Sequence, residues 1–370
     1  VDGANTFGLA NYAPHAAPSH GAIARIILRY ADGHEVQYLS DESWRAQTDP
    51  QEGWTRAGFD DREWQPAKVI AQAGDPPFGE LHPAPMEIPH CPMLRKRFEV
   101  AEKVRRATLY ASALGAYELH LNGQRIGDHY FAPGWTDYHR RVLYHTYDVT
   151  ELIALGDNAI GAYLGHGWYS GYLLSRVERG ITYAKCPRLL AQLEIEYEDG
   201  RVEVVATDAS WRAKHSPILG ADLYMGEVYD ARREALDTAN PGQDETSWEP
   251  VVGIMAMFPV LEAYPGAPVR AMKELTPQTI VEKGPNRFIL DMGQNMVGFA
   301  RIRVSEAAGT RITLRFGEML KPDGELYIEN LRSARATDEY ICAGTGDEVW
   351  QPRFTFHGFR YVEISGCSTM

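Results

Sequence analysis

The sequence predicts an all-β protein made of tandem antiparallel β-sandwiches. Hydrophobic and polar residues alternate along many short segments, which is the pattern of strands with one buried face. The 34 glycines and 22 prolines are typical of a chain with many turns between strands. With 370 residues, of which 44% are hydrophobic, the chain can form two or three domains that each bury a core.

The first predicted domain spans residues 1–88 and contains one copy of an internal repeat. The segment YADGHEVQYLSDESWRAQ from Tyr30 recurs as YEDGRVEVVATDASWRAK from Tyr197, with eight identities in 18 positions and an offset of 197 − 30 = 167. Each copy reads as a strand, an Asp-Gly turn, a second strand and a tryptophan suited to a core. More strand-like sequence precedes the second copy than the first. We therefore expect residues 1–88 to be a partial sandwich without its opening strands, or else a natural half-domain that leans on the next one.

The second predicted domain spans residues 89–262 and is a fuller sandwich. Its strand-like segments include ATLYASALGAYELHLNG, RVLYHTYDVT, NAIGAYLG, LLAQLEIEYEDG and VEVVATD. Between two of its strands, Asn122 and Gly123 suit the type I′ turn of a hairpin, because both residues tolerate a positive φ.

The second domain also carries an insertion relative to the first. The motif DDREWQP at Asp60 recurs as DETSWEP at Asp244, offset by 244 − 60 = 184 residues. This copy therefore has 184 − 167 = 17 extra residues, SPILGADLYMGEVYDAR (216–232). Part of the insertion falls in residues 222–236, which are the best candidate for a helix in the chain.

The third predicted domain spans residues 263–370 and follows the proline-rich link AYPGAPVR. Its strand-like segments are NRFILDMG, GFARIRVS, TRITLRFGEML and FRYVEISG. Short polar turns separate these segments, so another antiparallel sandwich is expected.

Composition also excludes several classes of function. A formal net charge of −13 argues against nucleic-acid binding, which needs clustered cations. No apolar run approaches the about 18 residues of a membrane helix, and no signal peptide is visible. We expect a cytoplasmic protein, although a leader could have been lost, since the chain starts at Val1. The spacing of the cysteines fits no zinc site, so they are predicted to be reduced and mostly buried thiols: Cys91, Cys186, Cys342 and Cys367.

From about Pro92 to Gly366 the chain resembles the bacterial α-L-rhamnosidases, inverting glycoside hydrolases that remove terminal α-L-rhamnose from plant glycosides and polysaccharides. The matching motifs are YELHLNGQRIGD (117–128), PGWTDYHRRVLYHTYDVT (133–150), GEVYDAR (226–232), LDMGQNMVGF (290–299), LRFGEMLKPDGELYIENLRSARATDEY (314–340) and PRFTFHGFRYVEISG (352–366). In that family these stretches belong to accessory sandwiches of jelly-roll, galactose-binding-like and concanavalin-like type.

The resemblance implies that the acid and base carboxylates lie on an α/α barrel that follows these sandwiches, so no catalytic residue is expected here. The expected function is to support that barrel in an enzyme acting on rhamnose-containing glycosides. The alternative is a free-standing carbohydrate-binding module for rhamnosides. Some family members bind rhamnose through calcium held by an Asp-Asn pair ahead of the YELHLNG strand. Leu114 and Gly115 stand there in this chain, which argues against calcium and leaves no cofactor expected.

Sugar binding is still suggested by aromatic residues, since sugar rings stack on aromatic faces. Trp135 and Asp137 lie in one loop, and His166, Trp168 and Tyr169 lie in the segment GHGWYSG. Ordinary packing at a loop is the alternative for His166, Trp168 and Tyr169, whereas Trp135 and Asp137 are the residues that keep lectin-like binding open.

A second set of polar residues could contact sugar or the barrel. Asp291, Gln294 and Asn295 match the donors and acceptors of sugar hydroxyls, although satisfying the backbone of a strand end is the more frequent role of such residues. His357 could bind sugar or act as a base, but a hydrogen-bonded core histidine is the expected reading. An acidic series between positions 318 and 338 is expected to be mostly a solvated face with a turn at 322–324.

Overall fold

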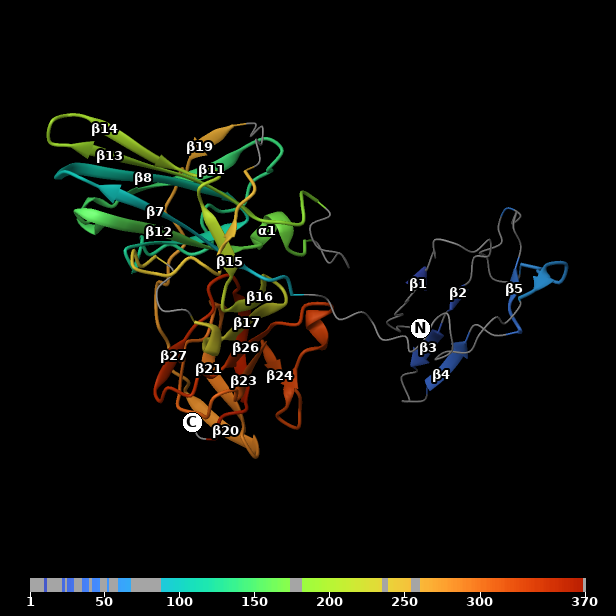
Figure 1. Ribbon diagram of the computed structural model, residues 1–370. Coiled ribbons are helices and arrows are strands. Elements are labelled where there is room, and N and C mark those ends of the chain that lie inside the picture. Colours follow the sequence, from blue (N-terminus) through green and yellow to red (C-terminus); the bar gives the residue numbers. More distant parts are fainter. Residues whose placement is uncertain are drawn as a thin grey trace. The chain divides into compact units, whose positions relative to one another are not determined.

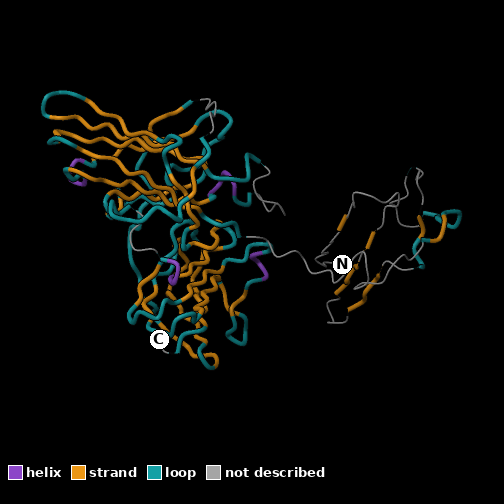
Figure 2. Tube along the Cα trace, in the orientation of Figure 1, coloured by secondary structure: helices purple, strands orange, loops and turns teal. Residues whose placement is uncertain are grey.

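The structure is a computed structural model that describes residues 88–173, 182–234, 239–253 and 260–368, together with residues 10–11, 22–23, 25–29, 35–39, 42–46, 52 and 59–67. The chain divides into two units, Val1–Pro85 and Met86–Met370. Almost all regular structure in these residues is strand (Figure 2), which confirms the all-β class. The helical segments are α1 (Gly167–Ser170) and the 3-10 turns η1 (Thr150–Leu152), η2 (Ala231–Arg233) and η3 (Glu329–Leu331). None of these helices could cross a membrane.

The described strands of the first unit form three antiparallel pairs: β1 (Ala10–Asn11) with β2 (Ala22–Ile23), β3 (Arg25–Arg29) with β4 (Glu35–Leu39), and β5 (Arg45–Ala46) with β6 (Gln65–Pro66). The β3–β4 pair is the hairpin expected for the first copy of the repeat, and its turn lies outside the described residues. Trp44 is 39% exposed, so it is not the core residue that the repeat predicts. The partial sandwich over residues 1–88 stays a prediction.

Two sheets form what we call the middle sandwich, drawn as stacked layers in Figure 1. The five-stranded sheet has the order β14 (Val202–Ala206), β13 (Arg188–Tyr197), β8 (Val104–Leu114), β11 (Val142–Asp148) and β19 (Leu261–Ala263). The six-stranded sheet has the order β10 (Gln124–Arg125), β9 (Ala116–Leu121), β12 (Gly156–Gly165), β7 (Pro92–Val100), β15 (Arg212–His215) and β18 (Glu249–Pro250). Their pairs are antiparallel except β11 with β19.

The core of the middle sandwich lies between its two sheets. Leu109 and Leu193 from the first sheet pack with Leu119 and Ile160 from the second. Trp211, the tryptophan of the second repeat copy, is buried in the same cluster as predicted. These contacts explain the alternating sequence, because alternate residues of each strand point into one layer.

Local turn chemistry follows the sequence closely in this sandwich. Asn122 and Gly123 have φ values of 50° and 82°, which confirms the type I′ turn between β9 and β10. In the second repeat copy, the β13–β14 hairpin turns at Gly200, whose φ is 86°.

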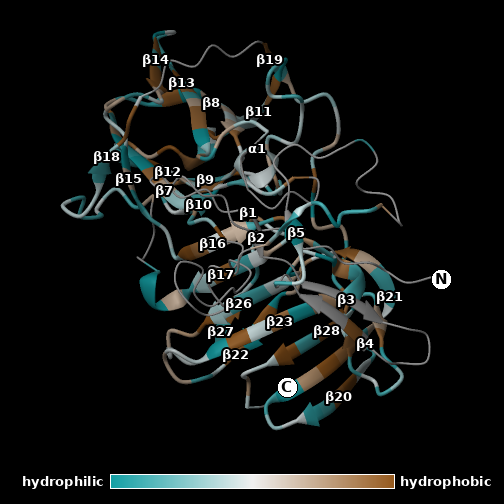
Figure 3. Cartoon of the chain, turned by 90° about the vertical axis from the view of Figure 1, so that its right-hand side faces the viewer, coloured by the Kyte–Doolittle hydropathy of each residue, from teal (hydrophilic) through white to brown (hydrophobic). Residues whose placement is uncertain are grey.

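The C-terminal sandwich is built on a seven-stranded sheet with the order β16 (Ile218–Asp222), β17 (Gly226–Asp230), β26 (Thr337–Ile341), β23 (Arg311–Gly317), β28 (His357–Ser365), β21 (Arg287–Gly298) and β20 (Thr279–Gly284). Two short pairs accompany it: β22 (Ile302–Val304) with β27 (Glu348–Trp350), and β24 (Met319–Leu320) with β25 (Leu326–Tyr327). Figure 3 shows hydrophobic and hydrophilic residues alternating along β23 and β28. Their buried residues, such as Leu314 and Val362, pack with Ile302 and Trp350 of the β22–β27 pair.

The insertion at 216–232 leaves the middle sandwich and joins this C-terminal sheet. Its hairpin β16–β17 adds to the sheet through a parallel pairing of β17 with β26. The helix predicted at 222–236 is therefore wrong for its described part. The Asp222 carboxylate accepts hydrogen bonds from the amides of Tyr224 (2.8 Å) and Met225 (3.2 Å), which makes a turn, and Gly226 has a φ of 100° that no helix contains. The domain limits of 89–262 and 263–370 stay a prediction, and this hairpin, from within 89–262, lies in the sheet of the later domain.

Candidate functional site

An aromatic platform lies on the surface of the middle sandwich. Trp135, in the loop between β10 and β11, is parallel to Trp168 of α1, with ring centroids 6.2 Å apart and an angle of 1° between the planes. Trp135 is 52% exposed. Phe131 packs edge-on against Trp168 at 6.3 Å and supports it. This pair can offer an indole face to the apolar side of a sugar ring.

The other three residues predicted with Trp135 and Trp168 have different positions. Asp137 is exposed, and its carboxylate accepts a hydrogen bond from the His139 amide at 3.1 Å. His166 is buried, with Nδ1 2.8 Å from Ser170 Oγ and Nε2 2.9 Å from the His90 carbonyl. Tyr169 is buried against Tyr138. His166 and Tyr169 therefore pack beneath the surface rather than on it.

The position that would hold calcium has no ligand side chain. Leu114 is buried beside Tyr138 and Val142, and Gly115 brings its Cα close to the Gly165 carbonyl, which a Cβ would approach within 2.5 Å. Among the residues that the structure describes, no group of three or more His, Cys, Asp or Glu side chains is arranged to hold a metal ion.

The polar residues of β21 surround a bulge in the C-terminal sheet. Pairing with β28 shifts between Asp291 and Met296, so residues 292–295 lie opposite Arg360 alone. Arg360 binds the Asp291 carboxylate through two contacts of 2.8 Å, and this hydrogen-bonded pair lowers the pKa of Asp291. Asp291 also accepts a hydrogen bond from the Gly293 amide at 2.7 Å. The structural role of Asp291 is thus to accept hydrogen bonds from the backbone and the arginine of the bulge.

The side-chain amides of the other two predicted residues, Gln294 and Asn295, lie at the surface. Gln294 and Asn295 are exposed, and Asn295 donates a hydrogen bond to Glu318 at 3.0 Å. The turn expected at 322–324 is present, since the Gly324 amide donates to the Lys321 carbonyl at 2.9 Å.

His357 is a buried, hydrogen-bonded core residue, as expected. Its Nε2 lies 3.0 Å from Asp338 Oδ1, and its ring stacks on Phe316 at 4.2 Å. Asp338 is buried, unlike the solvated face predicted for most of its acidic series. Its Oδ1 also accepts a hydrogen bond from the amide of Glu227, a second buried acid, at 2.9 Å. The sequence reading missed this cluster, because the two acids are 111 residues apart and meet only through the β17–β26 pairing.

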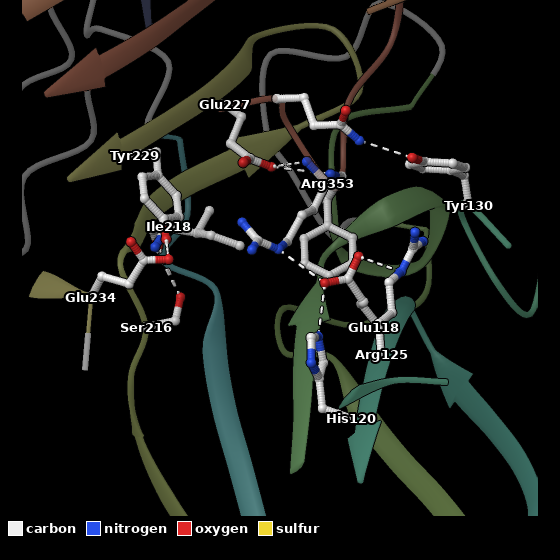
Figure 4. A network of polar contacts seen from close by, with 12 residues as sticks. Glu118, His120, Arg125, Tyr130, Ser216, Ile218, Glu227, Tyr229, Glu234 and Arg353 are labelled. Carbon is white, nitrogen blue, oxygen red and sulfur yellow. Dashed lines mark hydrogen bonds and ion pairs between the residues drawn. The ribbon is translucent and has the colours of Figure 1, made fainter. Parts of the chain in front are cut away.

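A polar cavity of about 260 Å³, here called the pocket, lies between the middle and C-terminal sandwiches. Strands β9 and β10 of the middle sandwich contribute Glu118, His120 and Arg125. The C-terminal sheet and the segment after β27 contribute most of the remaining lining, which includes Tyr229, Glu234, Tyr340, Trp350, Gln351 and Arg353. Figure 4 shows side chains of both sandwiches meeting there.

Glu118 is the centre of the polar contacts in the pocket. Its Oε1 lies 3.0 Å from both His120 Nε2 and Arg353 Nε, and its Oε2 lies 3.0 Å from Arg125 Nε. Burial opposes the ionisation of Glu118, but the hydrogen bond from His120 and the charges of Arg353 and Arg125 outweigh it and lower its pKa to about 2. The carboxylate is therefore ionised.

The sequence reading did not identify the pocket as a site. A signal was available in YELHLNG, where Glu118 and His120 occupy alternate positions of an otherwise apolar strand and so share one face. The partner Arg353 lies 235 residues away from Glu118, and no local pattern connects the two.

Comparison with known proteins matches two domains of one family. The family described as "Alpha-L-rhamnosidase N-terminal domain" matches residues 102–273. The "Bacterial alpha-L-rhamnosidase concanavalin-like domain" matches residues 281–370.

The similar proteins agree with these matches. An α-L-rhamnosidase of Streptomyces avermitilis is 46% identical over 367 residues, which are 98% of this chain and 35% of that protein. One from an Alteromonas species is 42% identical over 277 residues, which are 74% of this chain and 30% of that protein. The chain thus spans about a third of the length of the curated relatives it matches.

Solved structures show the same relation. The Streptomyces avermitilis enzyme, solved in complex with L-rhamnose, has a TM-score of 0.74 at 46% identity and covers 95% of this chain, which covers 34% of it. The α-L-rhamnosidase of Dictyoglomus thermophilum has a TM-score of 0.70 at 40% identity, with 76% of this chain and 31% of that one covered. The chain belongs to the bacterial α-L-rhamnosidase family, of which it contains the N-terminal and concanavalin-like sandwich domains.

Proposed function

We propose that this chain is the accessory sandwich portion of an α-L-rhamnosidase whose intact form hydrolyses terminal α-L-rhamnose from glycosides. The observation that carries the proposal is the match of both sandwiches to two successive domains of that family. The role of the sandwiches would be to support a catalytic α/α barrel. Inverting hydrolysis of a glycoside needs two carboxyl groups about 6.5–9.5 Å apart across a cleft, and we assign that pair to the barrel.

The face around β21 is our proposed contact surface for the barrel. Val297 is 75% exposed, and Met319 and Ile328 of the neighbouring segments are exposed as well. Asn295 and Glu318 lie beside them, joined by a hydrogen bond. Exposed apolar side chains with a polar rim are typical of interfaces between domains.

A chimera would test this proposal. The chain is joined to the remaining residues of the Streptomyces avermitilis relative in place of the matching segment, and release of p-nitrophenol from the aryl rhamnoside is measured. We expect turnover by the chimera and none by the 370-residue chain alone. Turnover by the chain alone, or a chimera no more active than the barrel segment by itself, would contradict the proposal.

The contact surface has its own matched pair of variants. Val297→Asp introduces a charge into the proposed interface and is expected to lower the melting temperature and activity of the chimera. Val252→Asp changes a residue that is 85% exposed on the middle sandwich and should leave both unchanged. Equal effects of the two variants would remove β21 from the interface.

A second candidate function is carbohydrate binding by the platform of Trp135 and Trp168. The observation in its favour is the parallel pair of indoles, of which Trp135 is exposed and Trp168 half-buried. Titration with L-rhamnose, with and without calcium, tests it. Saturable binding that Trp135→Ala abolishes supports a binding module, and binding that survives this variant excludes the platform.

A further inference from the structure

The pocket between the sandwiches is chemically unlike the platform of Trp135 and Trp168. Both sandwiches build it, and its polar groups come from strand positions that packing holds in place: Glu118 from β9, Arg125 from β10 and Tyr229 from β17. Gln351 and Arg353 follow β27 directly. A site on such elements is more rigid than a site on loops.

The formal charges of the pocket cancel. Arg125 and Arg353 carry positive charge, and Glu118 and Glu234 carry negative charge. Three of these four groups are already joined, because Glu118 contacts both arginines. A bound anion or cation would leave a charge uncompensated in a partly buried site, which is unfavourable. The electrostatics therefore favour a neutral polar ligand.

Several hydrogen-bonding atoms of the lining are still available. Within the described part of the chain, no hydrogen bond engages the two Nη atoms of Arg353, Oε1 of Gln351, Oε2 of Glu234 or Nδ1 of His120. Donors and acceptors thus stand around one small space. Ligands that carry hydroxyl groups, each both a donor and an acceptor, match such a mixed set.

Aromatic rings form another wall of the pocket. Tyr340 stacks on Trp350 at 5.3 Å and on Tyr229 at 6.0 Å, and Tyr130 lies across the pocket, bonded to Gln351 at 2.8 Å. Aromatic surfaces complement the C–H faces of a sugar ring. The volume of about 260 Å³ is below the roughly 300–1,000 Å³ of pockets for drug-sized ligands, so one ring fits better than an oligosaccharide.

We infer that the pocket is a non-catalytic binding site for a single ring of an uncharged sugar. The site depends on neither the barrel nor the platform, because every group that forms it belongs to the two sandwiches. Absence of sugar binding in the pocket would therefore leave the proposed function standing, and failure of the proposed function would leave the inference about the pocket standing.

The test uses fluorine NMR of the 370-residue chain labelled with 5-fluorotryptophan, in which Trp350→Phe identifies the Trp350 signal. L-rhamnose, D-glucose and D-galactose are each titrated, with D-galacturonate and inorganic phosphate as charged comparisons. We expect at least one neutral sugar to move the Trp350 signal saturably. The movement should persist in Trp135→Ala, which removes the platform and leaves the pocket intact.

Two substitutions examine the available atoms. Glu234→Ala, which changes an exposed residue of the lining, and Gln351→Ala should each weaken binding of the neutral sugar about tenfold. Each variant removes one hydrogen bond from the ligand to a charged or polar group. Glu198→Ala removes an exposed glutamate that is paired with Lys103 and does not line the pocket, and should have no effect. Circular dichroism confirms that each variant is folded.

Three outcomes would overturn the inference. The first is a Trp350 signal that no neutral sugar moves at the highest soluble concentration. The second is saturation by galacturonate or phosphate but not by the neutral sugars, which would show that the site prefers anionic ligands. The third is a response that Trp135→Ala abolishes, which would place the sugar on the platform.

Discussion

Two carboxyl groups near Arg353, that of the half-buried Glu118 and that of the buried Glu227, differ in protonation because their partners differ. Glu118 receives contacts from His120, Arg125 and Arg353, and its pKa falls to about 2. Glu227 accepts hydrogen bonds from the backbone amides of Arg353 and Phe354, both at 3.0 Å. Burial dominates there and raises the pKa of Glu227 to about 7. Its Oε1 has no partner in the part of the chain that the structure describes.

The raised pKa of Glu227 predicts a stability that depends on pH. Its ordinary pKa is 4.5 and its pKa in the folded state is about 7, so folding favours the protonated form. Its contribution to stability is full below pH 4.5 and is lost as pH rises through about 7. Glu227→Gln imitates the protonated acid and cannot ionise. We expect this variant to gain stability relative to the wild type across that interval, by roughly 3 kcal/mol at most.

Urea unfolding at a series of pH values measures this difference. Asp291→Asn is the matched control, because the hydrogen bond from Arg360 lowers the pKa of Asp291 below its ordinary value of 3.8, so its contribution is fully present above pH 3.8 and is lost only at lower pH. Its free-energy difference from the wild type should stay constant over the interval where that of Glu227→Gln changes. A constant difference for Glu227→Gln as well would show that Glu227 is ionised in the folded protein.

At the scale of single elements, the β16–β17 hairpin, which follows β15 of the middle sandwich in the chain, pairs with the C-terminal sheet through its backbone. Gly226 begins β17 with a φ of 100°, and a Cβ at this position would lie 2.0 Å from the Thr337 carbonyl oxygen of β26. The nearest atom is backbone, so it cannot move aside as a flexible side chain does. The hairpin can enter the sheet only with glycine at this position.

Gly226→Ala is expected to destabilise the C-terminal sandwich strongly, by several kcal/mol, because backbone strain and overlap with β26 act together. Gly200→Ala isolates the strain alone. Gly200 has a φ of 86° and no atom within 4 Å of its added Cβ, so the cost there should be about 1 kcal/mol. Urea unfolding compares the two variants. Similar losses in the free energy of unfolding would mean that position 226 has room for a methyl group beside the Thr337 carbonyl.

The same hairpin shows which features of the fold could not be predicted from the sequence. The alternation of residues and the Asn122-Gly123 turn are local, and both predicted the observed elements. The insertion of residues 216–232 was visible from the repeat, but its destination was not, because pairing of Val228 with Glu339 joins segments distant in sequence. Residues such as Leu223 and Met225 are buried by that pairing, and their apolar spacing was mistaken for a helix.

The candidate sites follow the same rule. Trp135 and Trp168 could be singled out, since aromatic residues between predicted strands can be recognised one by one. The pocket required knowledge of which strands face each other. Glu118 and Arg353 each look like an ordinary surface charge until the two sandwiches bring them within 3.0 Å.

At the scale of the whole second unit, Arg353 connects the middle and C-terminal sandwiches. Its Nε contacts Glu118 of β9, and its guanidinium lies 5.2 Å from the Tyr163 ring of β12 and 5.5 Å from the Tyr229 ring of β17. The charge of Glu118 helps to raise the pKa of Arg353, against the effect of burial. One side chain thus contacts strands of both sandwiches.

Replacing this arginine should loosen the contact between the sandwiches. Arg353→Met leaves the half-buried Glu118 with one arginine fewer. The two side chains are 22% and 12% exposed, so the cost should lie between the about 1 kcal/mol of an exposed pair and the about 3–5 kcal/mol of a fully buried one. Arg360→Met is the matched control, because Arg360 pairs with Asp291 inside one sheet and is 40% exposed, where a pair contributes about 1 kcal/mol or less. Hydrogen exchange should accelerate in both β9 and the segment after β27 in the first variant. In the second it should change only around β21 and β28, since both residues of that pair belong to the C-terminal sheet. Faster exchange confined to the C-terminal sandwich in Arg353→Met would mean that other contacts, such as the β16–β17 hairpin, hold the two sandwiches together without it.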